Sequence, residues 1–108
     1  MKSTIQFFFF ILFSISLLAC VMVQLTPSGG RVRVTRNPEV VKNCKYLNYV
    51  QGADHFNGGL AGQGAAEENA MRRIRNNTAM IGANTVYITS ITTGTSGSSI
   101  RGEAYFCK

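Results

Sequence analysis

The first hydrophobic pattern along the chain is an uncharged, Phe-rich stretch that follows Lys2. From Phe7 to Ala19 the residues are mostly apolar, and this length is typical of a signal-peptide hydrophobic region rather than a full membrane span. Ordinary secretory signals end in a small-x-small pattern. Here bulky Leu18 comes just before Ala19, and a cysteine follows. The segment predicts export with an unusual cleavage site.

The remaining sequence contains short β-type patterns and one helical pattern. Residues 31–35 alternate polar and apolar, which predicts a strand with Val32 and Val34 facing inward and the arginines outward. Three further segments are rich in β-branched and aromatic residues and predict strands: 44–50, 85–91 and 100–107. A Gly/Ser/Thr turn at 93–99 is expected to join the last two strands in an antiparallel hairpin.

The helix is predicted over residues 65–81, where apolar positions recur every three or four residues. Glu67 and Glu68 are expected in its first turn, and Gly82 ends it. A glycine-rich loop is expected before it, over residues 52–64. The order strand, strand, helix, strand, strand predicts an α+β fold, with a small antiparallel or mixed sheet and the helix on one face.

Residues 21–30 are uncharged and include a proline and a glycine pair, which suits a short tether. We therefore expect three parts: a signal peptide at 1–19, an acylated N-terminus and tether at 20–30, and a single small domain at 31–108.

The acylation follows from a resemblance. The string Leu17-Leu18-Ala19-Cys20 resembles a bacterial lipobox. In such signals the precursor is cut before the cysteine, whose thiol then carries a diacylglycerol and whose amine takes a third acyl chain. Each buried methylene contributes about 0.8 kcal/mol, so three chains hold a protein at a membrane. The alternative is an uncleaved signal anchor, because residues 5–22 could form a helix of about eighteen residues.

The chain has three cysteines. With Cys20 assigned to lipid, Cys44 and Cys107 are expected to form a disulfide in an oxidising compartment. Two alternatives have less support in the sequence. A redox pair usually has the Cys-x-x-Cys spacing, which is absent, and a zinc site would need more ligands from a chain with one histidine.

A family resemblance covers nearly the whole mature chain. Seven strings carry it: Leu25-Thr26-Pro27, Val32-Arg33-Val34, Asn37-Pro38-Glu39-Val40, Cys44-Lys45-Tyr46-Leu47, Ile74-Arg75-Asn76, Gly82-Ala83-Asn84-Thr85-Val86, and Gly102-Glu103-Ala104-Tyr105-Phe106-Cys107. They resemble the bacterial lipoproteins grouped as domain of unknown function 4156. In general plan the chain is also similar to the Rcs-type outer-membrane stress-sensor lipoproteins, although those have two disulfides.

The family resemblance implies an envelope address, an α+β fold and the bridge between Cys44 and Cys107. It supplies no reaction, substrate or site. In lipoproteins sorted as in enteric bacteria, Asp after the cysteine retains the protein in the inner membrane. Val21 occupies that position here, which implies the outer membrane, with the domain facing the periplasm.

The charge balance suggests an anionic partner. The chain has 11 Lys and Arg against 5 Asp and Glu, and removal of Lys2 with the signal leaves 10 against 5, a net charge of +5. Six arginines are candidate contacts: Arg31, Arg33, Arg36, Arg72, Arg73 and Arg75. Anionic lipid, lipopolysaccharide or an acidic envelope protein would fit, whereas the address excludes nucleic acid. The alternative is a solvated surface.

Candidate catalytic motifs are few. Gly62-Gln63-Gly64 resembles part of a dinucleotide loop, but Glu67 stands where a third glycine is needed and would repel a phosphate. Asp54 and His55 adjoin, without a reactive cysteine or a serine elbow. We therefore expect no enzyme activity, cofactor or metal, and a binding, structural or stress-sensing role. The alternative is a small envelope enzyme that uses Asp54 and His55.

Overall fold

The structure is a computed structural model that describes residues 4–6, 23–55 and 59–108, with the backbone alone described from 59 to 63. The expected signal peptide and the lipobox at residues 17–20 lie outside the described residues. None of the described helices is both long enough and apolar enough to cross a membrane.

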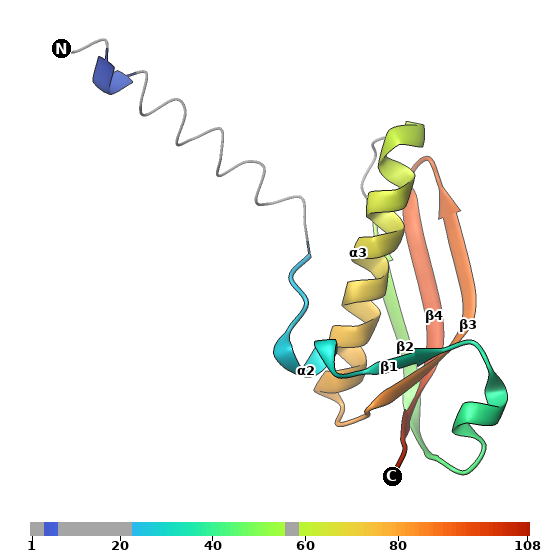
Figure 1. The fold of residues 1–108 in the computed structure, drawn as a ribbon. Coiled ribbons are helices and arrows are strands. Elements are labelled where there is room, and N and C mark those ends of the chain that lie inside the picture. Colours follow the sequence, from blue (N-terminus) through green and yellow to red (C-terminus); the bar gives the residue numbers. More distant parts are fainter. Residues whose placement is uncertain (1–3, 7–22, 56–58) are drawn as a thin grey trace.

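A four-stranded sheet forms the centre of the domain (Figure 1). Its strands are β1 (Arg33–Thr35), β2 (Lys45–Asp54), β3 (Thr85–Gly94) and β4 (Gly97–Phe106). The spatial order is β1-β3-β4-β2, so the first two strands in sequence form the two edges. β3 and β4 form the expected antiparallel hairpin, β2 pairs antiparallel with β4, and β1 pairs parallel with β3. The α+β prediction is confirmed, with a mixed sheet.

Helix α3 (Gly59–Met80) packs against one face of this sheet. The helix begins six residues before the predicted start at 65, so the prediction that Glu67 and Glu68 lie in its first turn was wrong. The predicted loop at 52–64 was also wrong in part. Its first residues, Gly52–Asp54, continue β2, and its last ones already belong to α3. Glycine content favoured a loop, but Gly52 lies in β2, and Gly59, Gly62 and Gly64 lie in α3.

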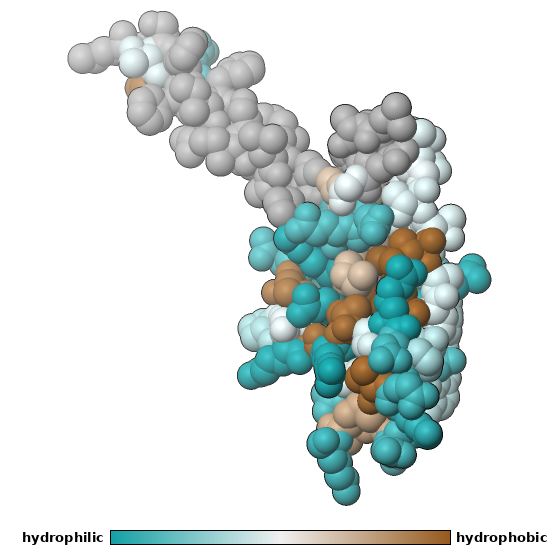
Figure 2. All heavy atoms as spheres, turned by 45° about the vertical axis from the view of Figure 1, so that its right-hand side comes forward, coloured by the Kyte–Doolittle hydropathy of each residue, from teal (hydrophilic) through white to brown (hydrophobic). Residues whose placement is uncertain are grey.

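Apolar side chains between α3 and the sheet form the core. Val32 is buried and Val34 is partly buried against the core, as the alternating pattern predicts. The buried cluster consists of Val32, Val50, Ala70, Ile74, Ala83, Val86, Ile88, Ile100 and Ala104. On the side of the molecule shown in Figure 2, hydrophobic residues form a band between hydrophilic ones. Five hydrophobic residues packed against the cluster are only partly buried: Val34, Leu47, Met71, Ala79 and Ile91.

Gly52 allows α3 to approach β2 closely. A Cβ atom at this position would overlap the carbonyl oxygen of Ala70 and lie 2.5 Å from the amide nitrogen of Ile74, both in the backbone of the helix. Glycine is therefore required here for lack of space, and any larger residue would move the helix away from the sheet.

Two short helices join the N-terminal elements. Helix α2 (Pro27–Gly30) is capped by the Thr26 side chain, which accepts a hydrogen bond from the Gly29 amide. The 3-10 helix η1 (Pro38–Val41) is capped in the same way by Asn37. Since proline occupies the first helical position in both, cap and proline together define where each turn begins.

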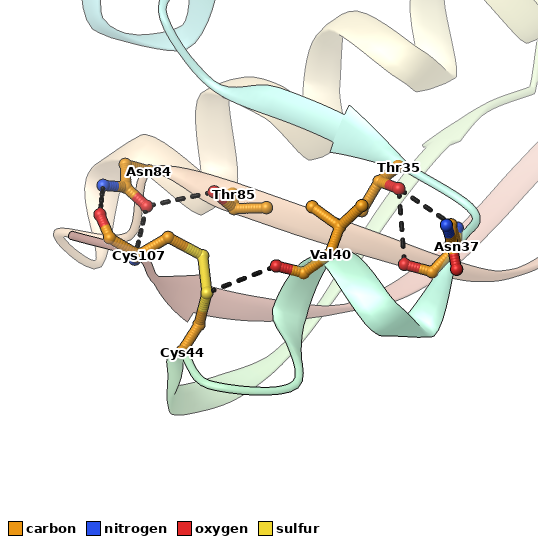
Figure 3. Close-up of a disulfide and its surroundings, with 7 residues drawn as sticks. All are labelled: Thr35, Asn37, Val40, Cys44, Asn84, Thr85 and Cys107. Atoms are coloured by element: carbon orange, nitrogen blue, oxygen red, sulfur yellow. Dashed lines mark hydrogen bonds between the residues drawn. A yellow bond between two sulfur atoms is a disulfide. The ribbon is translucent and has the colours of Figure 1, made fainter.

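The disulfide between Cys44 and Cys107 is present, with an S–S distance of 2.08 Å (Figure 3). It ties the start of β2 to the end of β4. The Asn84 side chain braces the same corner, because its Oδ1 accepts a hydrogen bond from the Cys107 amide at 2.8 Å and its Nδ2 donates to the Cys107 carbonyl at 2.6 Å. The bond spans a sequence separation of 63. In the chain-entropy model such a loop corresponds to about 4 kcal/mol of stabilisation.

Replacing Gly52 by alanine is expected to lower the free energy of unfolding by about 1–3 kcal/mol, because the new methyl group meets backbone atoms of α3 that cannot rotate aside. Gly94→Ala is the matched control in another strand, since no atom lies within 4 Å of the position its Cβ would take. Urea unfolding followed by circular dichroism measures both variants. A Gly52→Ala protein as stable as the parent would contradict the close approach.

Candidate functional site

Residues 23–30, which we call the strap, lie along the side of α3 that faces away from the sheet (Figure 1). The helix binds the strap main chain with side chains. Asn69 accepts a hydrogen bond from the Val23 amide at 3.1 Å, and Asn76 accepts one from the Thr26 amide at 3.0 Å and donates to the Gln24 carbonyl at 2.8 Å. Residues 23–30 were expected as a tether, but the structure binds them to the domain.

Two of the six candidate arginines hold this strap. Arg72 donates to the Val23 carbonyl at 3.3 Å and forms an ion pair with Glu68, at 2.6 Å. Arg75 donates to the carbonyl oxygen of Gly30 at 2.9 Å. Both guanidinium groups therefore have a structural role in docking the N-terminal segment to α3.

The other four candidate arginines, Arg31, Arg33, Arg36 and Arg73, have exposed side chains. They do not form one patch, because Arg33 belongs to β1 at the sheet edge and Arg73 to α3 on the other side of the sheet. The role of these side chains toward an anionic partner stays a prediction.

The face of the sheet opposite α3 gathers aromatic residues. All four tyrosines of the chain lie on it, two on β2 and one each on β3 and β4: Tyr46, Tyr49, Tyr87 and Tyr105. Alternation with the core residues Val50, Val86 and Ala104 places three of them there, Tyr49, Tyr87 and Tyr105. A register shift between Tyr46 and Asn48 brings Tyr46 to the same face, opposite Tyr105. We call this surface the tyrosine face.

The tyrosines surround the carboxylate of Glu103. In the strand register Glu103 lies between Tyr87 of β3 and Tyr49 of β2. The Tyr105 hydroxyl donates to Glu103 Oε2 at 2.6 Å, and the Tyr46 ring meets the Tyr105 ring edge to face, with centroids 5.6 Å apart. Edge-to-face packing of this kind favours an ordered aromatic cluster.

The hydrogen bond to Glu103, together with burial and the charge of that carboxylate, raises the pKa of Tyr105 to about 12. Its phenol therefore remains a neutral donor to the carboxylate over the whole physiological range.

Polar side chains continue the tyrosine face toward the β3–β4 turn. Gln51 is paired in register with Arg101, and its amide nitrogen donates to the hydroxyl of Ser99 at 3.3 Å. Tyr49 donates its hydroxyl to Gln51 Oε1, also at 3.3 Å. Arg101 is exposed beside this network. At the opposite end the tyrosine face ends near the disulfide, where the Thr85 side chain is buried and only 2% exposed.

Asp54 and His55, the candidate catalytic pair, have different surroundings. Asp54 accepts a hydrogen bond from Asn69 Nδ2 at 2.9 Å, which links the end of β2 to α3. His55 follows the strand with an exposed side chain. Gly62-Gln63-Gly64, considered above as part of a dinucleotide loop, lies within α3. Among residues 4–6, 23–55 and 59–108, no three His, Cys, Asp or Glu side chains gather where they could hold a metal ion.

Fold and site together define a small α+β domain closed by one disulfide, with a strapped helix on one side and an aromatic sheet face on the other. A family model described as a domain of unknown function, DUF4156, matches residues 23–107. The chain belongs to this family, and the match begins where the strap begins. Comparison with the curated proteins found no match.

The tyrosine face was not predicted from the sequence. The signal was present in β4, where Arg101, Glu103 and Tyr105 alternate with core residues. What the sequence could not supply was the strand order, which brings two tyrosines of β2 beside Tyr105 across a separation of more than fifty residues. The strap was missed because its contacts are side chain to main chain and leave no hydrophobic pattern.

Replacing Asn76 by alanine is expected to release the strap, because three hydrogen bonds to Gln24 and Thr26 are lost at once. Amide hydrogen exchange should then speed up by about tenfold or more at Thr26, as expected for a lost net stabilisation of roughly 1–2 kcal/mol. Arg73→Ala, on the same helix with an exposed side chain, is the control. Unchanged exchange in the Asn76 variant would show that these bonds do not hold the strap.

One tyrosine is expected to ionise late in an alkaline titration. The pKa of Tyr105 in the folded protein is about 12, above its ordinary value of 10.0, so its stabilising contribution is complete below pH 10 and is lost as the pH rises toward 12. Phenolate absorbance should therefore show one late step, which Tyr105→Phe removes and Glu103→Gln moves toward pH 10. A Glu103→Gln titration identical to that of the parent would refute this origin of the shift.

Proposed function

We propose that this protein is a lipid-anchored, non-enzymatic protein of the bacterial cell envelope, acylated at Cys20 and displayed in the periplasm from the outer membrane. Its role is to bind a partner through the surface of the folded domain. The motif at residues 17–20 is the basis for the anchor, and Val21 is the basis for the outer-membrane address.

The strap is the observation that carries this proposal. Val23 is held on α3 through both its amide and its carbonyl, so the folded domain starts three residues after Cys20. A fully extended chain covers at most about 11 Å over that distance. A cleaved and acylated Cys20 would therefore hold the domain directly at the bilayer surface. This arrangement suits a short, permanent anchor.

The disulfide gives independent support. Cys44 and Cys107 are bonded in the structure, and such bonds persist in exported proteins, whereas cytosolic reductants remove them. A periplasmic location supplies the oxidising conditions that this bond requires. A binding role is supported by the tyrosine face, because exposed tyrosine and arginine side chains are enriched where proteins recognise partners.

Replacing Cys20 by serine tests the anchor. The variant is expected to lose incorporation of radiolabelled palmitate and to accumulate as the longer precursor, because serine has no thiol to receive the diacylglycerol. Ser16→Ala, within the same hydrophobic segment, is the control and should be labelled like the parent. Unchanged labelling of the Cys20 variant would contradict the proposal. A parent protein that itself stays at the size of the precursor would instead show an uncleaved signal anchor.

A further inference from the structure

The domain has two opposite sides, and the strap lies on only one of them. The strap lies on the outer side of α3, the helix covers one face of the sheet, and the tyrosine face lies beyond the sheet (Figure 1). If Cys20 is acylated as proposed above, the acyl chains enter the bilayer on the strap side. The tyrosine face then points away from that membrane, toward the cell wall.

The chemistry of the tyrosine face suits a sugar chain. Tyr46 and Tyr49 expose 53% and 49% of their surface, so large aromatic areas are available beside the half-buried rings of Tyr87 and Tyr105. Aromatic rings stack on the C–H faces of pyranose rings, and tyrosine can do so without losing its hydroxyl contact to water or protein. The amide of Gln51 and the hydroxyl of Ser99 lie alongside and can bond to sugar hydroxyls.

The charges beside these rings favour a glycan that carries carboxylates. Arg101 lies in register with Gln51, and Arg33 lies in register with Thr85 at the β1 edge of the same face. Both guanidinium groups are exposed and present paired N–H donors that match a carboxylate. The Glu103 carboxylate accepts a hydrogen bond from the neutral Tyr105 hydroxyl and would repel a second carboxylate, so the carboxylate of the ligand would lie at Arg101. A second copy of this strongly basic chain would instead be repelled.

We infer that the tyrosine face binds the peptidoglycan of the cell wall, a glycan strand whose attached peptides carry carboxylates. Tyr46 and Tyr49 would stack on sugar rings, Gln51 and Ser99 would bond to their hydroxyls, and Arg101 would pair with a carboxylate. This assignment of the partner rests on the proposed envelope location, because the wall lies on the side of the domain opposite the anchor.

Sedimentation with purified peptidoglycan sacculi tests the inference. Full-length protein in detergent is mixed with sacculi, which are insoluble, and the bound fraction is measured in the pellet. Tyr46→Ala combined with Tyr49→Ala is expected to weaken binding at least about tenfold, the loss expected for two aromatic stacking contacts. Both side chains are about half exposed, so the fold should survive, and circular dichroism checks this.

Two controls identify the contacts. Met80→Ala combined with Ile81→Ala removes comparable exposed apolar surface at the far end of α3 and should bind like the parent. Arg101→Gln should weaken binding to sacculi while leaving the weaker binding to neutral N-acetylglucosamine oligomers unchanged. Equal affinity of the parent and the Tyr46/Tyr49 variant for the sacculi would overturn the inference. So would a Met80/Ile81 variant that loses as much binding as the Tyr46/Tyr49 variant.

The outcome is independent of the anchor. The Cys20→Ser protein should bind sacculi like the parent, because detergent-solubilised protein needs no membrane to present its tyrosine face. Failure of acylation with retained sacculus binding would refute the anchor alone. Failure of binding with normal acylation would refute the glycan assignment alone. The tyrosine face would be assigned to a protein partner if it crosslinked to an envelope protein while substitution of its tyrosines left sacculus binding unchanged. That result would overturn the inference.

Discussion

The contact between α3 and β2 at Gly52 sets the arrangement of the whole domain. There is one long helix in the described chain, and it must cover the apolar side of a four-stranded sheet. Without a side chain at Gly52, the backbone of the helix at Ala70 and Ile74 lies directly on the strand. This close contact excludes water from the core of a domain that is small for its surface. The strap takes its position from this helix, since it is bound to the side of α3 that faces away from the sheet.

Helix α3 uses its two sides in different ways. Toward the sheet it presents small and branched apolar side chains, of which Ala66, Ala70 and Ile74 are fully buried. Toward the strap it presents Asn69 and Asn76, whose amide groups bond to main-chain atoms. Such bonds each contribute only about 0.5–1.5 kcal/mol net. Docking of the N-terminal segment is therefore weaker than the core and depends on several bonds acting together.

The tyrosine face shows how a carboxylate is accommodated among aromatic rings. Glu103 receives a short hydrogen bond from Tyr105, whose pKa rises to about 12 as a result. The proton therefore stays on the phenol, and the pair remains one negative charge beside a neutral ring. Arg101 then provides cationic character on the same strand, two residues away. The surface thus combines stacking area with a separate site for an anion, which is the combination that an acidic glycan requires.

Local sequence determined the four strands and the long helix, because strand alternation and helical periodicity depend only on neighbouring residues. The two short helices α2 and η1 were not predicted. The sequence also identified Cys44 and Cys107 as partners, once the third cysteine was assigned to lipid. Element limits around Gly52 and Gly59 could not be predicted, since glycine favours loops until a tertiary contact requires it.

Tertiary structure alone decided the strand order β1-β3-β4-β2, which depends on pairings between distant segments. That order brings the four tyrosines together around Glu103 and places the strap on the opposite side of the molecule. The sequence by itself determined which residues can form strands, a helix and a disulfide. Only the folded chain decided which of their side chains share a surface, because long-range pairing and helix packing leave no periodic signal in the local sequence.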